Sequence, residues 1–153
     1  VSPGTSHKSL FRPDTYSARR FAPVYDRGVD VEIMLSEKSD IPLTPDASHY
    51  VGLQMWKQGA KVYMFQGGFH HSKIMMVDDK YCTVGSSNLD SRSLRYDFEV
   101  NTVVFDPEIT AQLTAMFEAD LKNCVPMNRD YWKAKSRWKR FVSWFGNSLT
   151  PFL

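Results

Sequence analysis

The sequence predicts an α/β domain, in which helices flank a mixed sheet of parallel and antiparallel strands. Short apolar stretches of strand length alternate along the chain with longer stretches of helical length. A strand–helix–strand order in the first half favours parallel strands. Two neighbouring apolar stretches joined by a tight turn at Asp79 and Lys80 favour an antiparallel hairpin. A chain of 153 residues can also bury a substantial core.

The first half of the chain supplies the predicted parallel unit. Residues 29–35 alternate apolar and polar side chains before becoming wholly apolar, as a buried strand does. Asp14 is a suitable N-cap for a first helix, and Gly59 is a suitable stop for a second helix. In order, we expect an irregular lead-in over residues 1–13, a helix over 14–26, a strand over 29–35, a helix over 46–58 and a strand over 61–66.

The second half supplies the predicted hairpin and the last helices. Pro107 occupies the first helical position, which proline favours, and apolar residues recur at helical spacing after residue 129. In order, we expect strands over residues 71–79 and 81–86, a loop with a short helix over 88–97, a strand over 98–105, a helix over 107–123 and a basic amphipathic helix over 129–149.

Charge and cysteine content exclude several classes of site. The net charge is only +2, and residues 129–147 hold six basic residues and one acidic residue, so the remainder of the chain is net acidic. Cys82 and Cys124 lie far apart in no CxxC pattern, so the sequence predicts neither a zinc site nor a disulfide framework. No apolar run approaches the length that spans a bilayer.

Residues 71–88 carry the strongest local pattern in the sequence. They fit the spacing HxK-x4-D-x6-GS-x-N at every fixed position, and these positions are His71, Lys73, Asp78, Gly85, Ser86 and Asn88. On a strand, side chains two residues apart point to the same face, so His71 and Lys73 are expected to project together. The second strand of the hairpin returns Ser86 and Asn88 to the same patch.

These side chains suit attack on a phosphodiester. Lys73 supplies a cation and the Asn88 amide a neutral donor for the charged non-bridging oxygens, which stabilises a transition state that gains charge. His71 can attack phosphorus and form a phosphohistidine, which divides one difficult displacement into two easier ones. Gly85 allows the backbone to approach this patch closely.

The pattern resembles the HxK motif of the phospholipase D superfamily. The resemblance implies that a downstream carboxylate holds the second nitrogen of the imidazole, and Glu99 matches that carboxylate in position and type. It also implies that Asp78, although part of the motif, has a structural role. The expected site residues are therefore His71, Lys73, Ser86, Asn88, Glu99 and Asp78, with Lys73, Ser86 and Asn88 binding substrate and with no metal or cofactor.

Longer stretches narrow the resemblance to the carboxy-terminal half of bacterial cardiolipin synthases. The similarity covers residues 27–123 and includes GFHHSKIMMVDD and TVGSSNLDSRSLRYDFEVNTVVFD. It implies a phospholipase D-like α/β half that transfers a phosphatidyl group between two phosphatidylglycerol molecules at the cytoplasmic face of the cell membrane. It also implies a supporting role for Asp90, Arg92 and Ser93. The expected segments are a lead-in and helix over residues 1–26, a phospholipase D-like catalytic domain over 27–125 and a basic aromatic tail over 126–153.

A single motif is chemically incomplete. A second acid must protonate the departing glycerol and then deprotonate the incoming alcohol, and the superfamily takes this group from a second HxK motif. We expect that motif from a missing half or from a homodimer, in which a two-fold axis brings two copies of His71 together. The alternatives are a dimeric phosphodiesterase or nuclease, which the acidic charge outside the tail disfavours, and an inert half that needs its partner half.

The tail over residues 129–149 suits a membrane surface as a partner. Trp138, Phe141 and Phe145 fall on one side of the expected helix and basic residues fall on the other. Helices of this kind bind anionic membranes through apolar burial and electrostatic attraction. The alternative is an amphipathic helix that packs on its own domain or on a partner.

Overall fold

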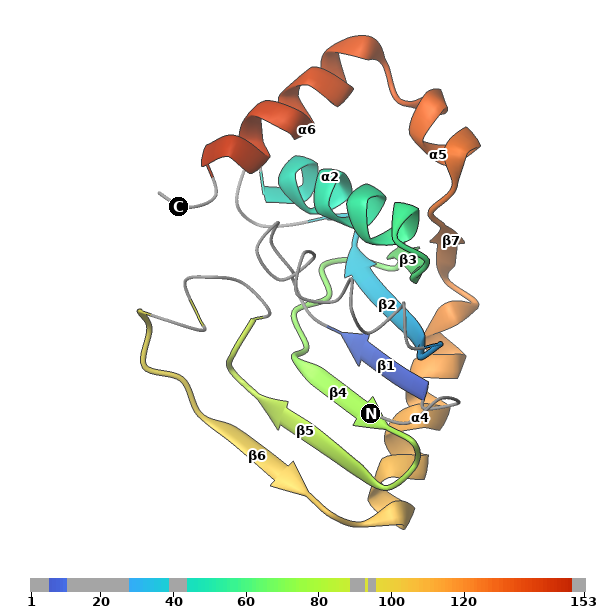
Figure 1. Ribbon diagram of the computed structural model, residues 1–153, viewed down its shortest axis with the longest axis vertical. Coiled ribbons are helices and arrows are strands. Elements are labelled where there is room, and N and C mark those ends of the chain that lie inside the picture. Colours follow the sequence, from blue (N-terminus) through green and yellow to red (C-terminus); the bar gives the residue numbers. More distant parts are fainter. Residues whose placement is uncertain (1–5, 11–27, 39–43, 89–92, 94–95, 150–153) are drawn as a thin grey trace.

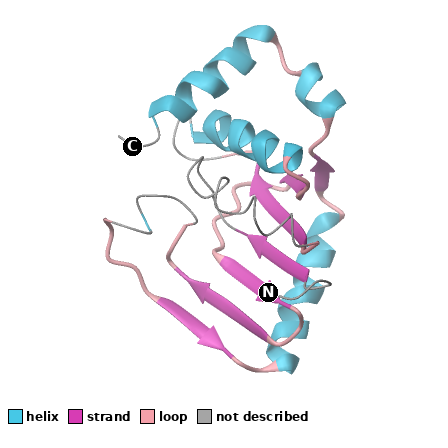
Figure 2. Ribbon diagram, in the orientation of Figure 1, coloured by secondary structure: helices cyan, strands magenta, loops and turns pink. Residues whose placement is uncertain are grey.

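One mixed sheet, covered by helices, organises the described part of the chain (Figures 1 and 2). The computed structural model describes residues 6–10, 28–38, 44–88, 93 and 96–149. In these ranges the strands are β1 (Ser6–Leu10), β2 (Asp30–Ser36), β3 (Lys61–Phe65), β4 (Ile74–Val77), β5 (Tyr81–Gly85), β6 (Asn101–Val104) and β7 (Cys124–Pro126). The helices of these ranges are α2 (Thr44–Lys57), α4 (Pro107–Leu121), α5 (Arg129–Ala134) and α6 (Arg137–Leu149).

The strand order β6-β5-β4-β1-β2-β3-β7 combines parallel and antiparallel pairs. Strands β1, β2 and β3 run parallel, and the other neighbouring pairs are antiparallel. Leu10 lies opposite Ile74, so β4 begins beside the end of β1. Gly85 lies opposite Asn101, so β5 ends beside the beginning of β6. The ends of β1, β2, β3 and β5 and the beginnings of β4 and β6 therefore lie along one border of the sheet, which runs across the strands. We call this border the β4-entry edge.

The two faces of the sheet carry separate cores, because alternate residues of a strand point to opposite faces. In β2, Ile33 and Leu35 pack in one cluster with Met55 of α2. Met34, from the same strand, packs in a second cluster with Phe117 of α4. Helices α2 and α4 therefore cover opposite faces. Helix α6 packs on the outer side of α2 and adds a further layer there (Figure 1).

Most of the expected elements are confirmed, and two helix ends have clear local causes. Helix α4 begins after Asp106, whose carboxylate accepts hydrogen bonds from the N–H groups of Glu108 and Ile109 at 2.8 and 3.2 Å. Pro107 occupies the first helical position, as expected. Helix α2 ends before Gly59, whose φ of +108° favours glycine. The strands expected over residues 29–35, 61–66 and 81–86 correspond to β2, β3 and β5.

The expectation of an irregular lead-in over residues 1–13 is wrong, because Ser6–Leu10 form β1. This strand lies between β2 and β4, inside the sheet. Its sequence, SHKSL, has no apolar–polar alternation, so pairing on both sides rather than local preference makes it a strand. The sheet therefore extends beyond the expected domain start at residue 27. The helix expected over residues 14–26 lies outside the described residues.

Two expected strands are shorter in the structure. The strands expected over residues 71–79 and 98–105 correspond to β4 and β6, and each begins three residues later than expected. At the other end of β4, Asp78 and Asp79 both have a φ of +51°, which ends the strand in a tight turn. The expected hairpin turn is confirmed, but the residues before β4 and β6 are not part of the ladders.

The tail is two helices rather than the single expected helix. Helix α5 ends at Ala134, and Lys135 has an extended backbone. The Ser136 side chain then accepts a hydrogen bond from the N–H of Lys139 at 3.2 Å, which caps the beginning of α6. Strand β7, which precedes the tail, was not expected, because three residues are too few for a periodic signal. None of the described helices is both long enough and apolar enough to cross a membrane.

Replacing Phe117 with Ala should lower the free energy of unfolding by about 3–5 kcal/mol, because the substitution leaves a cavity in a fully buried cluster. The ring is 0% exposed and packs between α4 and the sheet. Phe98, which is 106% exposed, provides the matched control. Its replacement by Ala should change stability by less than about 0.5 kcal/mol. Urea unfolding measures both, and equal losses would contradict the described packing.

Candidate functional site

Backbone hydrogen bonds bring three segments of the motif region together at the β4-entry edge. The N–H of Gly85, at the end of β5, donates to the carbonyl of Lys73, just before β4, at 3.1 Å. The N–H of Ser86 donates to the carbonyl of Val100, just before β6, at 2.9 Å. These bonds continue the strand pairing beyond the strands themselves. They hold Lys73, Ser86 and Glu99 close together.

Glu99 is the negative charge of this arrangement. The hydroxyl of Ser86 donates to the Glu99 carboxylate and accepts a hydrogen bond from the N–H of Val100 at 3.0 Å. Hydrogen bonds from Ser86 and Ser93 lower the pKa of Glu99 and outweigh the opposing effect of desolvation, and the charge of Lys73 makes a smaller contribution in the same direction as the hydrogen bonds. Glu99 therefore remains ionised at neutral pH. Ser93, for which the sequence implied a supporting role, contacts the site through this carboxylate.

Lys73 and His71 do not project from a strand as expected, because both precede β4. The Lys73 side chain is buried, and its ammonium group donates to the carbonyl of His71 at 3.0 Å. The His71 imidazole is exposed and stacks on the ring of Phe69, with 5.2 Å between the ring centroids. A lysine-to-backbone hydrogen bond, rather than strand alternation, therefore links the two motif residues.

Asn88 carries an unpaired polar atom beside this group. Its Oδ1 atom is buried and has no hydrogen-bond partner among the described residues. Ser87, next to it, donates its N–H to the side-chain oxygen of Asn101 at 3.4 Å, which ties the loop to the beginning of β6. Because the oxygen and nitrogen of a carboxamide exchange places when the group flips, Asn88 can present either an acceptor or a donor here.

Asp78, which was expected among the site residues with a structural role, lies apart from these residues. It lies in the β4–β5 turn, at the opposite end of β4 from Lys73. Five residues of extended chain separate Lys73 from Asp78 by about 16 Å. The Asp78 carboxylate lies 3.8 Å from the ammonium group of Lys80. Its fixed position in the motif reflects a residue of the hairpin turn.

Glycine is required at position 85 because neighbouring atoms of Val100 and Asn101 occupy the space that a side chain would need. A β-carbon at this position would lie 2.1 Å from the side-chain oxygen of Asn101 and 2.4 Å from the carbonyl oxygen of Val100. The second contact is with backbone, so a larger residue would have to displace the segment that carries Glu99. The expectation that Gly85 allows a close backbone approach is confirmed.

The sequence patterns did not reveal a second polar cluster at the β4-entry edge. Glu37 directly follows β2, and its carboxylate accepts a hydrogen bond from the hydroxyl of Tyr131 in α5. His49 Nε2, in α2, and Lys135 Nζ lie 3.0 and 3.4 Å from the oxygens of the same carboxylate. We call these four residues the Glu37 cluster. Its members are far apart in the sequence and follow no motif, so no local signal could have identified it.

The Glu37 cluster holds an ionised carboxylate in a largely buried setting. Burial acts to raise the pKa of Glu37, but the contacts with His49 and Tyr131 and the charge of Lys135 outweigh it and lower the pKa to about 2. Burial and the hydrogen bond to Glu37 raise the pKa of Tyr131. The cluster thus joins α2, α5 and Lys135, which follows α5, to the end of β2.

Ser36 connects the Glu37 cluster to the motif. Its hydroxyl oxygen accepts a hydrogen bond from the N–H of His70 at 3.0 Å. His70 itself lies 3.6 Å from the carboxylate of Asp120 and packs edge-on against the ring of Phe65. The backbone next to His71 is therefore attached to the end of β2.

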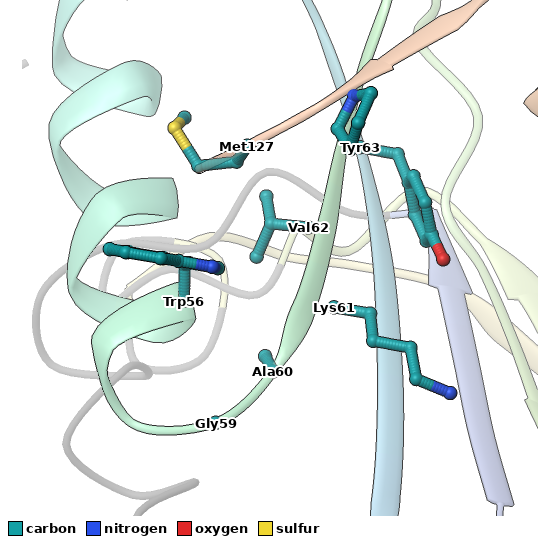
Figure 3. A pocket seen from close by; sticks show the side chains of 8 residues that line it. Trp56, Gly59, Ala60, Lys61, Val62, Tyr63 and Met127 are labelled. Atoms are coloured by element: carbon teal, nitrogen blue, oxygen red, sulfur yellow. The ribbon is translucent and has the colours of Figure 1, made fainter. Parts of the chain in front are cut away.

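A hollow of about 340 Å³ lies at the opposite edge of the sheet, where β3 begins (Figure 3). Trp56 at the end of α2 and Met127 after β7 form part of its wall. Lys61 is the charged residue among the described residues that line it, and its ammonium group pairs with Asp30 and Glu32 at 2.6 and 3.2 Å. The motif residues other than Asp78 are at the β4-entry edge, so we place the candidate site there.

Comparisons with known proteins assign the chain to a family. The family described as "Cardiolipin synthase, PLD-like domain" matches residues 8–121. "Cardiolipin synthase 1" of Bacillus anthracis is 32% identical over 158 residues, which cover 98% of this chain and 31% of that protein. The chain therefore belongs to the cardiolipin synthase family of phospholipase D-like domains. It spans about a third of the length of this relative.

Two solved structures share the fold. Nuc from Salmonella typhimurium, a phospholipase D family member, has a TM-score of 0.71 at 18% identity, over 83% of this chain and 84% of that chain. The phosphatidylserine synthase of Haemophilus influenzae has a TM-score of 0.68 at 15% identity, over 99% of this chain and 40% of that chain. The expected phospholipase D-like α/β fold is confirmed.

Replacing Glu37 with Gln should lower the free energy of unfolding at pH 7 by about 1–3 kcal/mol, because charge-assisted hydrogen bonds are lost. A carboxylate with a lowered pKa contributes stability that is complete above its ordinary value of 4.5 and disappears as the pH falls towards 2. The difference in the free energy of unfolding between the parent and Glu37→Gln should therefore become smaller as the pH is lowered. Urea unfolding at pH 7 and at lower pH values measures this difference.

The exposed pair of Asp30 and Lys61 provides the control for this experiment. Asp30→Asn should change stability by less than about 1 kcal/mol. A difference between the parent and Glu37→Gln that stays constant as the pH falls would contradict the described Glu37 cluster.

Proposed function

We propose that the protein is the catalytic carboxy-terminal half of a phosphatidyltransferase of the cardiolipin synthase type. The observation that carries this proposal is the assembly of Lys73, Ser86 and Glu99 at the β4-entry edge, next to an exposed His71. Both substrates are phosphatidylglycerol, and the products are cardiolipin and glycerol. The chemistry uses side chains alone.

The proposed reaction has two displacements at phosphorus. In the first, the imidazole of His71 attacks phosphorus, the P–N bond forms, and the P–O bond to glycerol breaks while an acid protonates the departing oxygen. In the second, the deprotonated form of that acid accepts the proton from the hydroxyl of another phosphatidylglycerol. The hydroxyl oxygen attacks the phosphorus of the phosphohistidine, the P–N bond breaks, and the imidazole is released. Water in place of the alcohol yields phosphatidic acid.

The charged and polar residues of the site have distinct proposed roles. Glu99, ionised and fixed by hydroxyl groups, holds the second nitrogen of the His71 imidazole and stabilises the positive charge that develops there. Lys73 and Asn88 bind the non-bridging oxygens of the phosphate. The unpaired position of the Asn88 carboxamide, which holds a donor when the group flips, supports this role. Ser86 keeps the Glu99 carboxylate in place and adds a hydroxyl next to the phosphate.

The group that acts as the acid of the first step and the base of the second is assigned to the histidine of a second HxK motif, from a missing half or a second copy of this chain. Apolar side chains beside the site support a partner that covers it. Phe98 and Val100, which flank Glu99, are 106% and 77% exposed, and Tyr96 and Phe69 are also exposed. In the described part of the chain, β6 pairs with β5 alone and leaves its other edge open. A partner at this surface would adjoin the catalytic residues.

We also propose that the protein works at the cytoplasmic face of the cell membrane and contacts it through the tail over residues 129–149. A lipid substrate requires access to a bilayer. The basic residues of the tail match the negative surface of the cytoplasmic leaflet. Cys82 and Cys124 are free thiols, which suits a reducing compartment.

Replacing His71 with Ala should abolish formation of cardiolipin and glycerol from phosphatidylglycerol vesicles, with a loss of at least about a thousandfold, because the nucleophile is gone. His70→Ala is the matched control, since it removes the neighbouring imidazole that pairs with Asp120. It should retain activity within about tenfold. Chromatography of the lipid products measures both variants.

The same preparations should be incubated with single-stranded DNA. Cleavage of DNA without any product from phosphatidylglycerol would reject the transferase in favour of a dimeric nuclease. Activity that appears when the preceding half of a longer chain is added would identify this chain as a half that needs its partner half. Activity of His71→Ala equal to that of the parent would remove His71 as the nucleophile.

A further inference from the structure

Helix α6 presents its apolar side to solvent. Ser143 is fully buried where α6 packs on α2, and its hydroxyl donates to the carbonyl of Lys139 at 2.9 Å. At about 100° per residue, Trp138, Phe141 and Phe145 lie on the opposite side of the helix and Trp144 lies on its flank. We call these four residues the aromatic stripe. A helix that packs on its own domain normally has the reverse arrangement.

The aromatic stripe is a continuous exposed surface. Trp138 is 71% exposed, Phe141 and Trp144 are each 50% exposed, and Phe145 is 47% exposed. Phe141 lies at its centre, with 5.8, 5.9 and 6.3 Å between its ring centroid and those of Trp138, Trp144 and Phe145. Contiguous exposed aromatic side chains mark a surface that another molecule or a membrane covers.

The charges of α6 favour a membrane over another protein as the partner that covers the aromatic stripe. The helix contains Arg137, Lys139 and Arg140 and has no acidic residue in its sequence RWKRFVSWFGNSL. Tryptophan and phenylalanine next to arginine and lysine are the residues of helices that lie in the headgroup region of anionic bilayers. A second exposed apolar surface, around Phe98 and Val100, lies just before β6, whose outer edge is open in the described part of the chain, and it suits a protein partner.

Helix α6 is also held in place by the rest of the domain. Within the Glu37 cluster, Glu37 contacts Tyr131 of α5 and Lys135, the residue before the Ser136 cap. Along its length α6 packs on α2 (Figure 1). The aromatic stripe is therefore an outer face of the domain, in a fixed position relative to the β4-entry edge.

We propose that α6 binds an anionic phospholipid bilayer while it remains docked on α2. The helix lies parallel to the surface, the aromatic stripe enters the headgroup region, and the basic residues contact lipid phosphates. This inference deepens the proposed function, since it specifies how the tail meets the membrane that holds the substrate. It depends on the proposed function only in taking a lipid surface as the place of the reaction.

The test is co-sedimentation of the full chain with vesicles of phosphatidylcholine, or of phosphatidylcholine and phosphatidylglycerol in equal parts. The mixed vesicles should bind at least about tenfold more tightly, and added salt should weaken their binding. Inorganic phosphate and dispersed short-chain phosphatidylglycerol serve as soluble competitors. Competition by either at low concentration would point to a headgroup pocket and overturn binding through the stripe.

Paired variants isolate the contribution of the stripe. Trp138→Ser combined with Phe141→Ser should weaken binding to the mixed vesicles at least about tenfold, because apolar burial is lost. Arg137→Gln combined with Arg140→Gln should remove most of the preference for phosphatidylglycerol. Phe98→Ser combined with Phe105→Ser is the matched control, since it removes two exposed aromatic rings outside the tail. This control should bind within about twofold of the parent.

Other outcomes would overturn the inference. Vesicle binding that is unchanged in the stripe variant would remove the stripe as the contact. Self-association that the stripe variant abolishes, without vesicle binding by the parent, would identify a second copy as the occupant. Faster hydrogen exchange of the α2 amides on vesicles would show that α6 leaves α2 when it binds. Circular dichroism confirms that each variant is folded.

The proposed function and this inference fail in different ways. His71→Ala should bind vesicles as the parent does, because binding needs no catalysis. Vesicle binding without any lipid product would leave the inference standing and count against the proposed function. Activity on dispersed short-chain phosphatidylglycerol, without binding to mixed vesicles, would reject the inference alone.

Discussion

The site depends on two backbone hydrogen bonds, from Gly85 to the carbonyl of Lys73 and from Ser86 to the carbonyl of Val100. They extend the β4–β5 and β5–β6 pairings past the ends of the strands, so three segments that are distant in the sequence share one edge of the sheet. The second bond is possible because Gly85 has no β-carbon to strike the Val100 carbonyl. The proposed chemistry thus rests on sheet register, and a slip of one residue would turn the side chains to the wrong face.

The motif could be recognised from the sequence because its spacing reflects a hairpin, but the detailed reason for that spacing could not. His71 and Lys73 were expected to share the face of a strand, whereas both precede β4 and are joined by a hydrogen bond from the lysine ammonium group to the histidine carbonyl. Asp78 lies in the turn of the hairpin, away from the other motif residues. Regular spacing therefore predicted which residues form the motif, but it did not predict which groups their side chains contact.

Contacts between distant parts of the chain account for what the sequence patterns missed. The β1 sequence SHKSL is a strand because β2 and β4 pair with it on both sides, and no local preference records that. A single helix was expected over residues 129–149. The break after α5 lets the hydroxyl of Tyr131 reach Glu37, and the aromatic residues of α6 remain exposed. Secondary-structure periodicity carries no information about such a partner in another element.

The central claim is that an exposed imidazole at this edge becomes covalently attached to phosphorus. The most direct measurement is to mix the protein with phosphatidylglycerol, quench rapidly at alkaline pH, where a phosphohistidine survives, and locate the adduct by mass spectrometry of peptides. A phosphatidyl group on His71 is the predicted result. An adduct on His70 or on any other residue, or turnover with no adduct under conditions that trap other phosphohistidines, would contradict the claim.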